Sequence, residues 1–132
     1  PATQLGSLHE VMSAADFVVV ATPGGAGTTK LIDAAAFAAM KPSGIFINIS
    51  RGEVVDEVAL IDVLESRQIA GAGLDVYEKE PHVPDRLKAL ESCVLLPHLG
   101  SATAETRQAM GQMALDNIIA FSEGREPPQK VN

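Results

Sequence analysis

Cysteine, tryptophan and positive charge are scarce in this sequence of 132 residues. The single cysteine, Cys93, excludes an internal disulfide and fits a reducing compartment, so we expect a cytoplasmic protein. Ten Lys and Arg residues against 17 Asp and Glu give a net charge of -7, which argues against binding to nucleic acid or to an anionic membrane. No apolar run approaches the ~20 residues that a helix needs to span a bilayer. Aromatic residues make up only 4% of the chain, so aliphatic side chains and Met must build the core.

Four short apolar runs are present, and each leads into a turn or a polar segment. They cover residues 17–21, 45–49, 72–76 and 94–96. Continuous apolar runs rich in β-branched residues are typical of parallel strands that are covered on both faces. Pro97 stops the fourth run, because proline cannot donate a hydrogen bond to a strand ladder. The sequence therefore predicts four parallel strands.

Helical patterns separate the apolar runs and follow the last of them. One helix is expected over residues 34–40, and the longest over residues 103–123. Arg67 is expected in the last turn of the helix between them, where its charge complements the helix dipole. Gly124 is the predicted C-cap of the longest helix. Three side chains are placed to cap helix N-termini: Asp33, Asp56 and Thr103.

Alternating strands and helices predict an α/β fold, a Rossmann-like parallel sheet flanked by helices. A complete doubly wound dinucleotide-binding fold has about six strands in two halves. Only four are visible here and the chain begins at Pro1 rather than Met, which suggests that the first half lies upstream. We therefore interpret residues 1–123 as the second half of a dinucleotide-binding domain with its closing helix, and residues 124–132 as a polar tail.

The segments after the first two predicted strands are the first candidates for a site, because ligands of open α/β sheets gather at the carboxyl ends of the strands. Thr22 and Pro23 lead into residues 24–27 (Gly-Gly-Ala-Gly), where bare backbone can approach a ligand, although a flexible turn explains the glycines equally well. This segment is not a P-loop, and the Gly-x-Gly-x-x-Gly turn occurs nowhere in the chain. Ser50 and Arg51 follow the second strand.

Arg51 offers a planar guanidinium that can hold a small carboxylate through two parallel hydrogen bonds. A surface ion pair with Glu53 or Asp56 is the simpler alternative for this side chain. The choice between a clamp and a surface pair stays open at the level of the residues alone.

Three titratable residues lie at or beyond the ends of the third and fourth predicted strands. Asp75 ends a buried strand, where a carboxylate needs a specific hydrogen-bond partner. Glu80 precedes Pro81 and can act as a partner for His98, which follows Pro97 and is suited to proton transfer near neutral pH. A structural loop histidine is the alternative. The sequence predicts no metal site, and Cys93 is interpreted as a small core residue.

In their order and spacing, these segments resemble the D-isomer-specific 2-hydroxyacid dehydrogenases over nearly the whole chain. No single segment is decisive, whereas the order and spacing together are highly specific. The matching segments are residues 15–17, 40–42, 48–56, 59–60, 71–76, 80–81 and 97–103. Within the family, residues 96–103 (Leu-Pro-His-Leu-Gly-Ser-Ala-Thr) and the early ending are most similar to glyoxylate/hydroxypyruvate reductases.

The resemblance implies a catalytic set in which Arg51 clamps the substrate carboxylate, His98 is the acid/base and Glu80 is its partner. Asp75 would hold the nicotinamide carboxamide. The implied cofactor-binding residues are Thr22, Pro23, Ser50, Arg51, Asp75, His98 and Gly100. The segment after Pro23 departs from the Leu-Thr-type segment of many relatives, which puts any contact there in doubt.

The resemblance also implies an oxidoreductase that uses NAD or NADP, with the residues that choose between them upstream of Pro1. Its partners would be a small 2-keto or 2-hydroxy acid and a second copy in a homodimer of the full-length protein. Phosphoglycerate dehydrogenase and a nucleotide-sensing corepressor scaffold remain alternatives within the family. The 132 residues alone are expected to be inactive.

Overall fold

The computed structural model describes residues 2–131, and the chain divides into two compact units at the junction of Pro97 and His98. The first unit contains a parallel sheet and its connecting helices. The second contains the longest helix, α5 (Ala104–Ser122), and the polar tail that follows it. The domain boundary at residue 123 stays a prediction.

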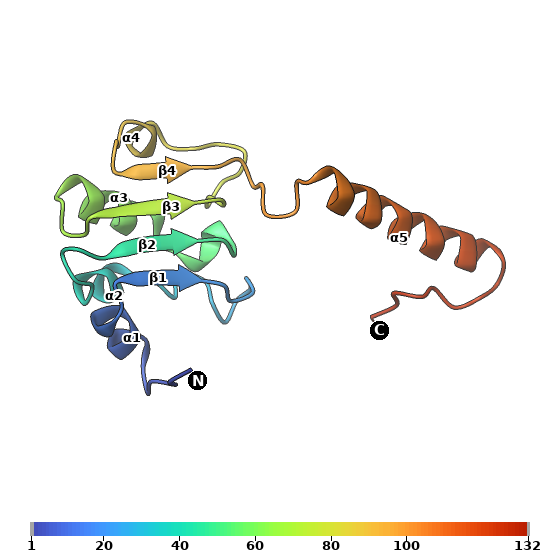
Figure 1. Cartoon of the computed structure of the whole chain (residues 1–132), viewed down its shortest axis with the longest axis horizontal. Coiled ribbons are helices and arrows are strands. Elements are labelled where there is room, and N and C mark those ends of the chain that lie inside the picture. The colour runs from blue at the N-terminus through green and yellow to red at the C-terminus, as the bar shows by residue number, and fades with distance from the viewer. Residues whose placement is uncertain (1, 132) are drawn as a thin grey trace. The chain divides into compact units, whose positions relative to one another are not determined.

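The sheet of the first unit has four parallel strands in the order β1-β2-β3-β4 (Figure 1). The strands are β1 (Phe17–Val20), β2 (Ile45–Asn48), β3 (Gly71–Leu74) and β4 (Cys93–Leu95). Each strand pairs with the next one along the chain, with Phe17 opposite Ile45 and Ile45 opposite Gly71. The predicted Rossmann-like parallel sheet is thereby confirmed, with strand ends that differ by one or two residues from the apolar runs.

The helices of the first unit are α1 (Leu8–Ala14), α2 (Ala34–Ala38), α3 (Glu57–Glu65) and α4 (Asp85–Lys88), with a 3-10 turn over Gly52–Val54. The sequence did not predict α1 or α4, which are short. The three predicted N-caps are confirmed, because each side-chain oxygen accepts a hydrogen bond from a backbone N–H three residues ahead. These pairs are Asp33 with Ala36, Asp56 with Ala59, and Thr103 with Thr106.

The C-terminal ends of α3 and α5 share one geometry. Gly124 follows α5 with φ of 73°, and Arg125 N–H donates to the Ala120 carbonyl, a Schellman closure that confirms the predicted glycine cap. Arg67 takes the same left-handed position after α3, with φ of 55°. The expectation that Arg67 lies in the last turn was therefore wrong: the helix ends at Glu65, and Arg67 occupies a position usually held by glycine.

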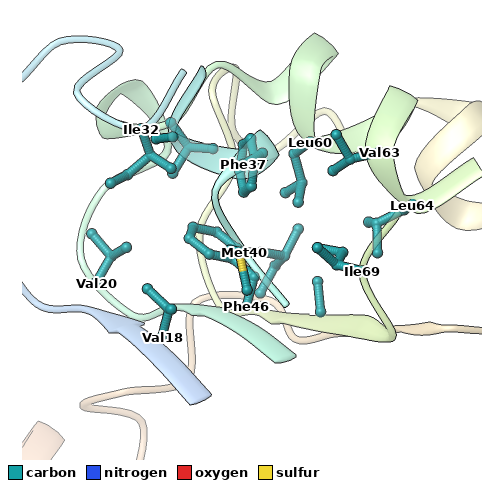
Figure 2. Packing of buried hydrophobic residues seen from close by; sticks show 14 of the residues in the cluster. Val18, Val20, Ile32, Phe37, Met40, Phe46, Leu60, Val63, Leu64 and Ile69 are labelled. Atoms are coloured by element: carbon teal, nitrogen blue, oxygen red, sulfur yellow. The ribbon is translucent and has the colours of Figure 1, made fainter. Parts of the chain in front are cut away.

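The hydrophobic core lies between one face of the sheet and the helices. Figure 2 shows Val18 and Phe46 from the strands facing Phe37, Leu60 and Leu64 from α2 and α3. The rings of Phe37 and Phe46 meet edge to face, with their centroids 5.0 Å apart. Such an aromatic pair contributes about 0.5–1.5 kcal/mol beyond its buried area, which is useful in a chain with few aromatic residues.

The opposite face of the sheet exposes apolar side chains in the structure. Phe17 is 66% exposed, Val19 53% and Val94 64%. The first unit by itself therefore covers only one face of its sheet, so the expected cover on both faces is not met within residues 2–97. The reason is the strand order. Each connection leads to the next strand on the same side of the sheet, and because such crossovers are right-handed, all connecting helices lie on one face.

Among residues 2–131, none of the helices has the length and apolar character that a membrane span requires.

We predict that residues 1–132 produced alone associate in solution, because the open face places large apolar side chains in water. Light scattering should report masses above that of a monomer. Val19→Lys, which introduces a charge on the open face, should shift the mass toward the monomer. The matched control is Ala35→Lys, which adds the same charge on the exposed side of α2. A monodisperse wild-type monomer would contradict the prediction.

Candidate active site

The predicted site residues of the first unit follow the carboxyl ends of neighbouring strands. Thr22 and Pro23 come after β1, Ser50 and Arg51 after β2, and Asp75 directly after β3. Because β1, β2 and β3 are adjacent and parallel, these residues all leave the same edge of the sheet. The sheet topology therefore brings residues from three separate strand ends to one edge of the sheet.

Asn48, the last residue of β2, builds the turn that carries Ser50 and Arg51. Asn48 is only 2% exposed, and its Oδ1 accepts hydrogen bonds from Ser50 N at 3.0 Å and Ser50 Oγ at 3.1 Å. Its Nδ2 donates to the Arg51 carbonyl at 3.1 Å. A buried amide with both ends bonded is a rigid support, so the Ser50–Arg51 turn is held from inside.

The Arg51 side chain is exposed, and its guanidinium Nη1 donates to the Ser50 carbonyl at 2.6 Å. The two acids proposed as ion-pair partners are engaged elsewhere. Glu53 Oε1 accepts from Gly25 N at 2.7 Å, and Asp56 pairs with Lys30 at 3.2 Å. In this structure Arg51 therefore forms no surface ion pair with Glu53 or Asp56.

The glycine-rich segment after β1 packs closely on the Arg51 turn. A Cβ added to Gly24 would lie 2.5 Å from Glu53 Oε1 and 3.0 Å from Arg51 Cγ. Glycine at position 24 therefore permits the close approach of the two loops, and the flexible-turn interpretation of this segment is incomplete. The loop after β1 forms one wall beside Arg51.

The two acids after β3 lie in different surroundings. Asp75 is buried, with 7% of its surface exposed, and its backbone N–H donates to the Asn48 carbonyl at 3.0 Å. Glu80 is exposed, and its Oε1 accepts a hydrogen bond from Tyr77 N at 3.1 Å. A buried carboxylate at the carboxyl edge of the sheet suits a specific hydrogen-bond donor, whereas an exposed carboxylate can change its partner.

His98 and Gly100 belong to the second unit, so the pairing of His98 with Glu80 stays a prediction. Both residues are exposed. His98 has φ of 55°, in the left-handed region that few non-glycine residues adopt and that is found disproportionately at functional sites.

Three residues of this edge were not singled out from the sequence: Asn48, Gly52 and Tyr77. Asn48 ends an otherwise apolar strand, and Tyr77 is the only tyrosine of the chain, so both carried a detectable signal. Gly52 gives no such signal, because its role depends on a contact with the backbone of Tyr77. A Cβ on Gly52 would lie 1.9 Å from the Tyr77 carbonyl carbon and oxygen.

Among the described residues, neither an activated thiol nor a metal site is found. Cys93 is half-buried and packs against the core, and burial raises the pKa of its thiol to about 11, as expected for a cysteine that is not activated. Between residues 2 and 131, no group of three His, Cys, Asp or Glu side chains could hold a metal ion.

Comparison with known proteins gives a family match over residues 2–100, to the NAD binding domain of D-isomer specific 2-hydroxyacid dehydrogenases. A glyoxylate reductase from Pyrococcus furiosus is 47% identical over 125 residues, which are 95% of this chain and 37% of that protein. A hydroxyphenylpyruvate reductase from Plectranthus scutellarioides is 45% identical, over 93% of this chain and 39% of its own length. The chain thus spans about two fifths of the length of these relatives.

Solved structures show the same likeness. A glyoxylate/hydroxypyruvate reductase from Sinorhizobium meliloti, crystallised with NADP and malonate, is 42% identical with a TM-score of 0.84, over 92% of this chain and 40% of that one. A protein from Thermus thermophilus has a TM-score of 0.90 at 42% identity, over 96% of this chain and 40% of its own.

We predict that Gly52→Ala destabilises the protein by about 1–3 kcal/mol, the usual cost of overpacking, because its methyl group would overlap the Tyr77 backbone. Gly73→Ala is the matched control, since its Cβ would meet only Ile47 Cγ1 at 4.0 Å. Urea unfolding of both variants checks the difference. Equal stability of the two would show that Gly52 has room for a side chain.

Proposed function

Because this chain belongs to the D-isomer-specific 2-hydroxyacid dehydrogenase family, we propose that the whole protein reduces a small 2-keto acid with NADH or NADPH, and catalyses the reverse oxidation. Glyoxylate and hydroxypyruvate are the proposed substrates. The support is the identity of 47% with a glyoxylate reductase and the likeness to a glyoxylate/hydroxypyruvate reductase. We also propose a homodimer in the cytoplasm.

Arg51 is the proposed carboxylate clamp. Its turn is held by the buried Asn48, and its backbone leaves the carboxyl edge of the sheet. A planar guanidinium binds a carboxylate through two parallel hydrogen bonds, and an N–H near the keto oxygen also polarises the C=O bond. The Nη1 contact with the Ser50 carbonyl would then break or be shared when substrate binds.

His98 is the proposed acid/base. In reduction it would donate a proton to the keto oxygen, and in oxidation it would take the proton back from the hydroxyl group. Glu80 would accept a hydrogen bond from the other ring N–H of His98, which orients the imidazole. The exposure of both side chains and the left-handed backbone of His98 support a role in a site rather than in the core.

The residues present fit a nicotinamide cofactor. The buried carboxylate of Asp75 at the carboxyl end of its strand is an acceptor suited to the carboxamide NH2. The cofactor, NAD or NADP, supplies hydride chemistry when bound. The proposed holding residues are Thr22, Pro23, Ser50, Arg51, Asp75, His98 and Gly100.

The observation that carries the proposal is the arrangement of Arg51 and Asp75 at the carboxyl ends of adjacent parallel strands in a chain that matches this family. The test is turnover: the whole protein should oxidise NADH or NADPH when glyoxylate or hydroxypyruvate is added. Tight nucleotide binding without turnover would favour the corepressor scaffold instead.

We predict that His98→Ala in the whole protein lowers kcat for keto-acid reduction by about 10²–10⁴-fold, the usual contribution of general acid catalysis. Cofactor affinity should change little. The matched control is His9→Ala, which removes an exposed histidine of α1 and should leave the kinetics unaltered. Near-normal turnover of His98→Ala would remove His98 from the mechanism.

We predict that Arg51→Lys lowers kcat/KM for glyoxylate and hydroxypyruvate by roughly 10- to 100-fold, because a point charge cannot replace a bidentate clamp. Arg67→Lys is the matched control, since Arg67 follows α3 at the opposite edge of the sheet. Steady-state kinetics with both substrates check the result. Equal kinetics of Arg51→Lys and wild type would show that Arg51 does not hold the substrate.

A further inference from the structure

Tyr77 contacts three parts of the carboxyl edge from one buried position. It lies three residues after the end of β3 and is 7% exposed, within the hydrophobic core. No role in the proposed chemistry has been assigned to it. Its hydroxyl, its backbone N–H and its carbonyl each contact a different segment.

The hydroxyl reaches the end of the neighbouring strand. Tyr77 Oη donates to the Leu96 carbonyl at 2.9 Å, and it lies 3.4 Å from the Leu74 carbonyl. Burial raises the pKa of this phenol, so it stays neutral and remains a donor at physiological pH. Leu96 is separated from His98 only by Pro97, so the bond fixes the last peptide before the Pro-His segment.

The backbone of Tyr77 contacts the other two proposed catalytic segments. Its N–H donates to Glu80 Oε1 at 3.1 Å, which orients that carboxylate. Its carbonyl side packs on Gly52, where there is no room for a Cβ. Gly52 follows Arg51 directly, so the Arg51 turn rests on the Tyr77 peptide.

The next peptide is also held. Glu78 N–H donates to Glu57 Oε1, at the start of α3, at 2.9 Å. Leu96 N–H in turn donates to the Leu74 carbonyl at 2.8 Å, which ties the end of β4 to β3. Tyr77 therefore cannot shift without moving the segments attached to it.

We propose that Tyr77 is a positioning residue: its hydroxyl ties the strand end leading to His98 to the same residue whose backbone supports the carboxylate of Glu80 and the Arg51–Gly52 turn. The proposal rests on the proposed function, since it acts through residues assigned to that reaction. It goes beyond core packing, because phenylalanine would fill the same volume without the bond to the Leu96 carbonyl.

The test compares Tyr77→Phe with wild type in the whole protein. Hydrogen–deuterium exchange should become faster in the peptide over residues 96–101, while exchange in β1 and β2 stays the same. Loss of one hydrogen bond should lower kcat for keto-acid reduction by about 2- to 10-fold. The KM for NADH or NADPH should stay within about 2-fold, because the bond acts on the acid/base segment.

Ile69→Val is the matched control. Ile69 is 2% exposed and lies just before β3, at the opposite edge of the sheet, so the variant loses core packing without touching the Tyr77 bonds. It should leave both kcat and the exchange of residues 96–101 unaltered. An equal loss of kcat in Ile69→Val would show that Tyr77→Phe acts by lowering the stability of the protein and not by releasing the strand end.

The two proposals fail in different ways. Absence of keto-acid reduction by the wild-type protein overturns the proposed function, and the exchange of residues 96–101 still decides whether Tyr77 holds the strand end. Unchanged exchange in Tyr77→Phe overturns the positioning role, whether or not the protein is active. Faster exchange with unchanged kcat in an active protein overturns it as well.

Discussion

The parallel pairing of four strands in chain order is the constraint on which the first unit depends. It sends every carboxyl end to one edge, so loops that are distant in the sequence meet there. It also places every crossover helix on one face and leaves the face with Phe17 and Val19 open. The candidate site and the exposed apolar surface are therefore two consequences of the same topology.

At the carboxyl edge, buried polar groups take over from apolar packing. Both ends of the Asn48 amide form hydrogen bonds with the Ser50–Arg51 turn, and the Tyr77 hydroxyl donates to the Leu96 carbonyl. A buried donor or acceptor without a partner costs about 1–3 kcal/mol, so each of these bonds selects one loop conformation. In residues 2–131, every buried side-chain N or O atom has a hydrogen-bond partner.

The sequence predicted the elements whose signals are local. Apolar runs located the strands, and the oxygen atoms of Asp33, Asp56 and Thr103 located helix starts, because those patterns depend on neighbouring residues only. It missed the open face, since strand order is a long-range property, and it missed Gly52, since that glycine matters only against the Tyr77 backbone. The candidate residues themselves were recognisable. Of the residues that support them, Asn48 and Tyr77 carried a signal in the sequence, whereas Gly52 did not.

The proposed binding of a carboxylate by Arg51 has to work against the acidic character of this chain, whose net charge is -7. Screening limits the problem, because at physiological ionic strength charges act over about 8 Å. What matters is then the charge next to Arg51, and there Glu53 bonds to the Gly25 amide while Asp56 pairs with Lys30. Neither acid forms an ion pair with the guanidinium. By bonding to Glu53 and supplying Lys30 as the partner of Asp56, the loop after β1 leaves the Arg51 guanidinium without an ion pair to either acid, which suits the proposed carboxylate clamp.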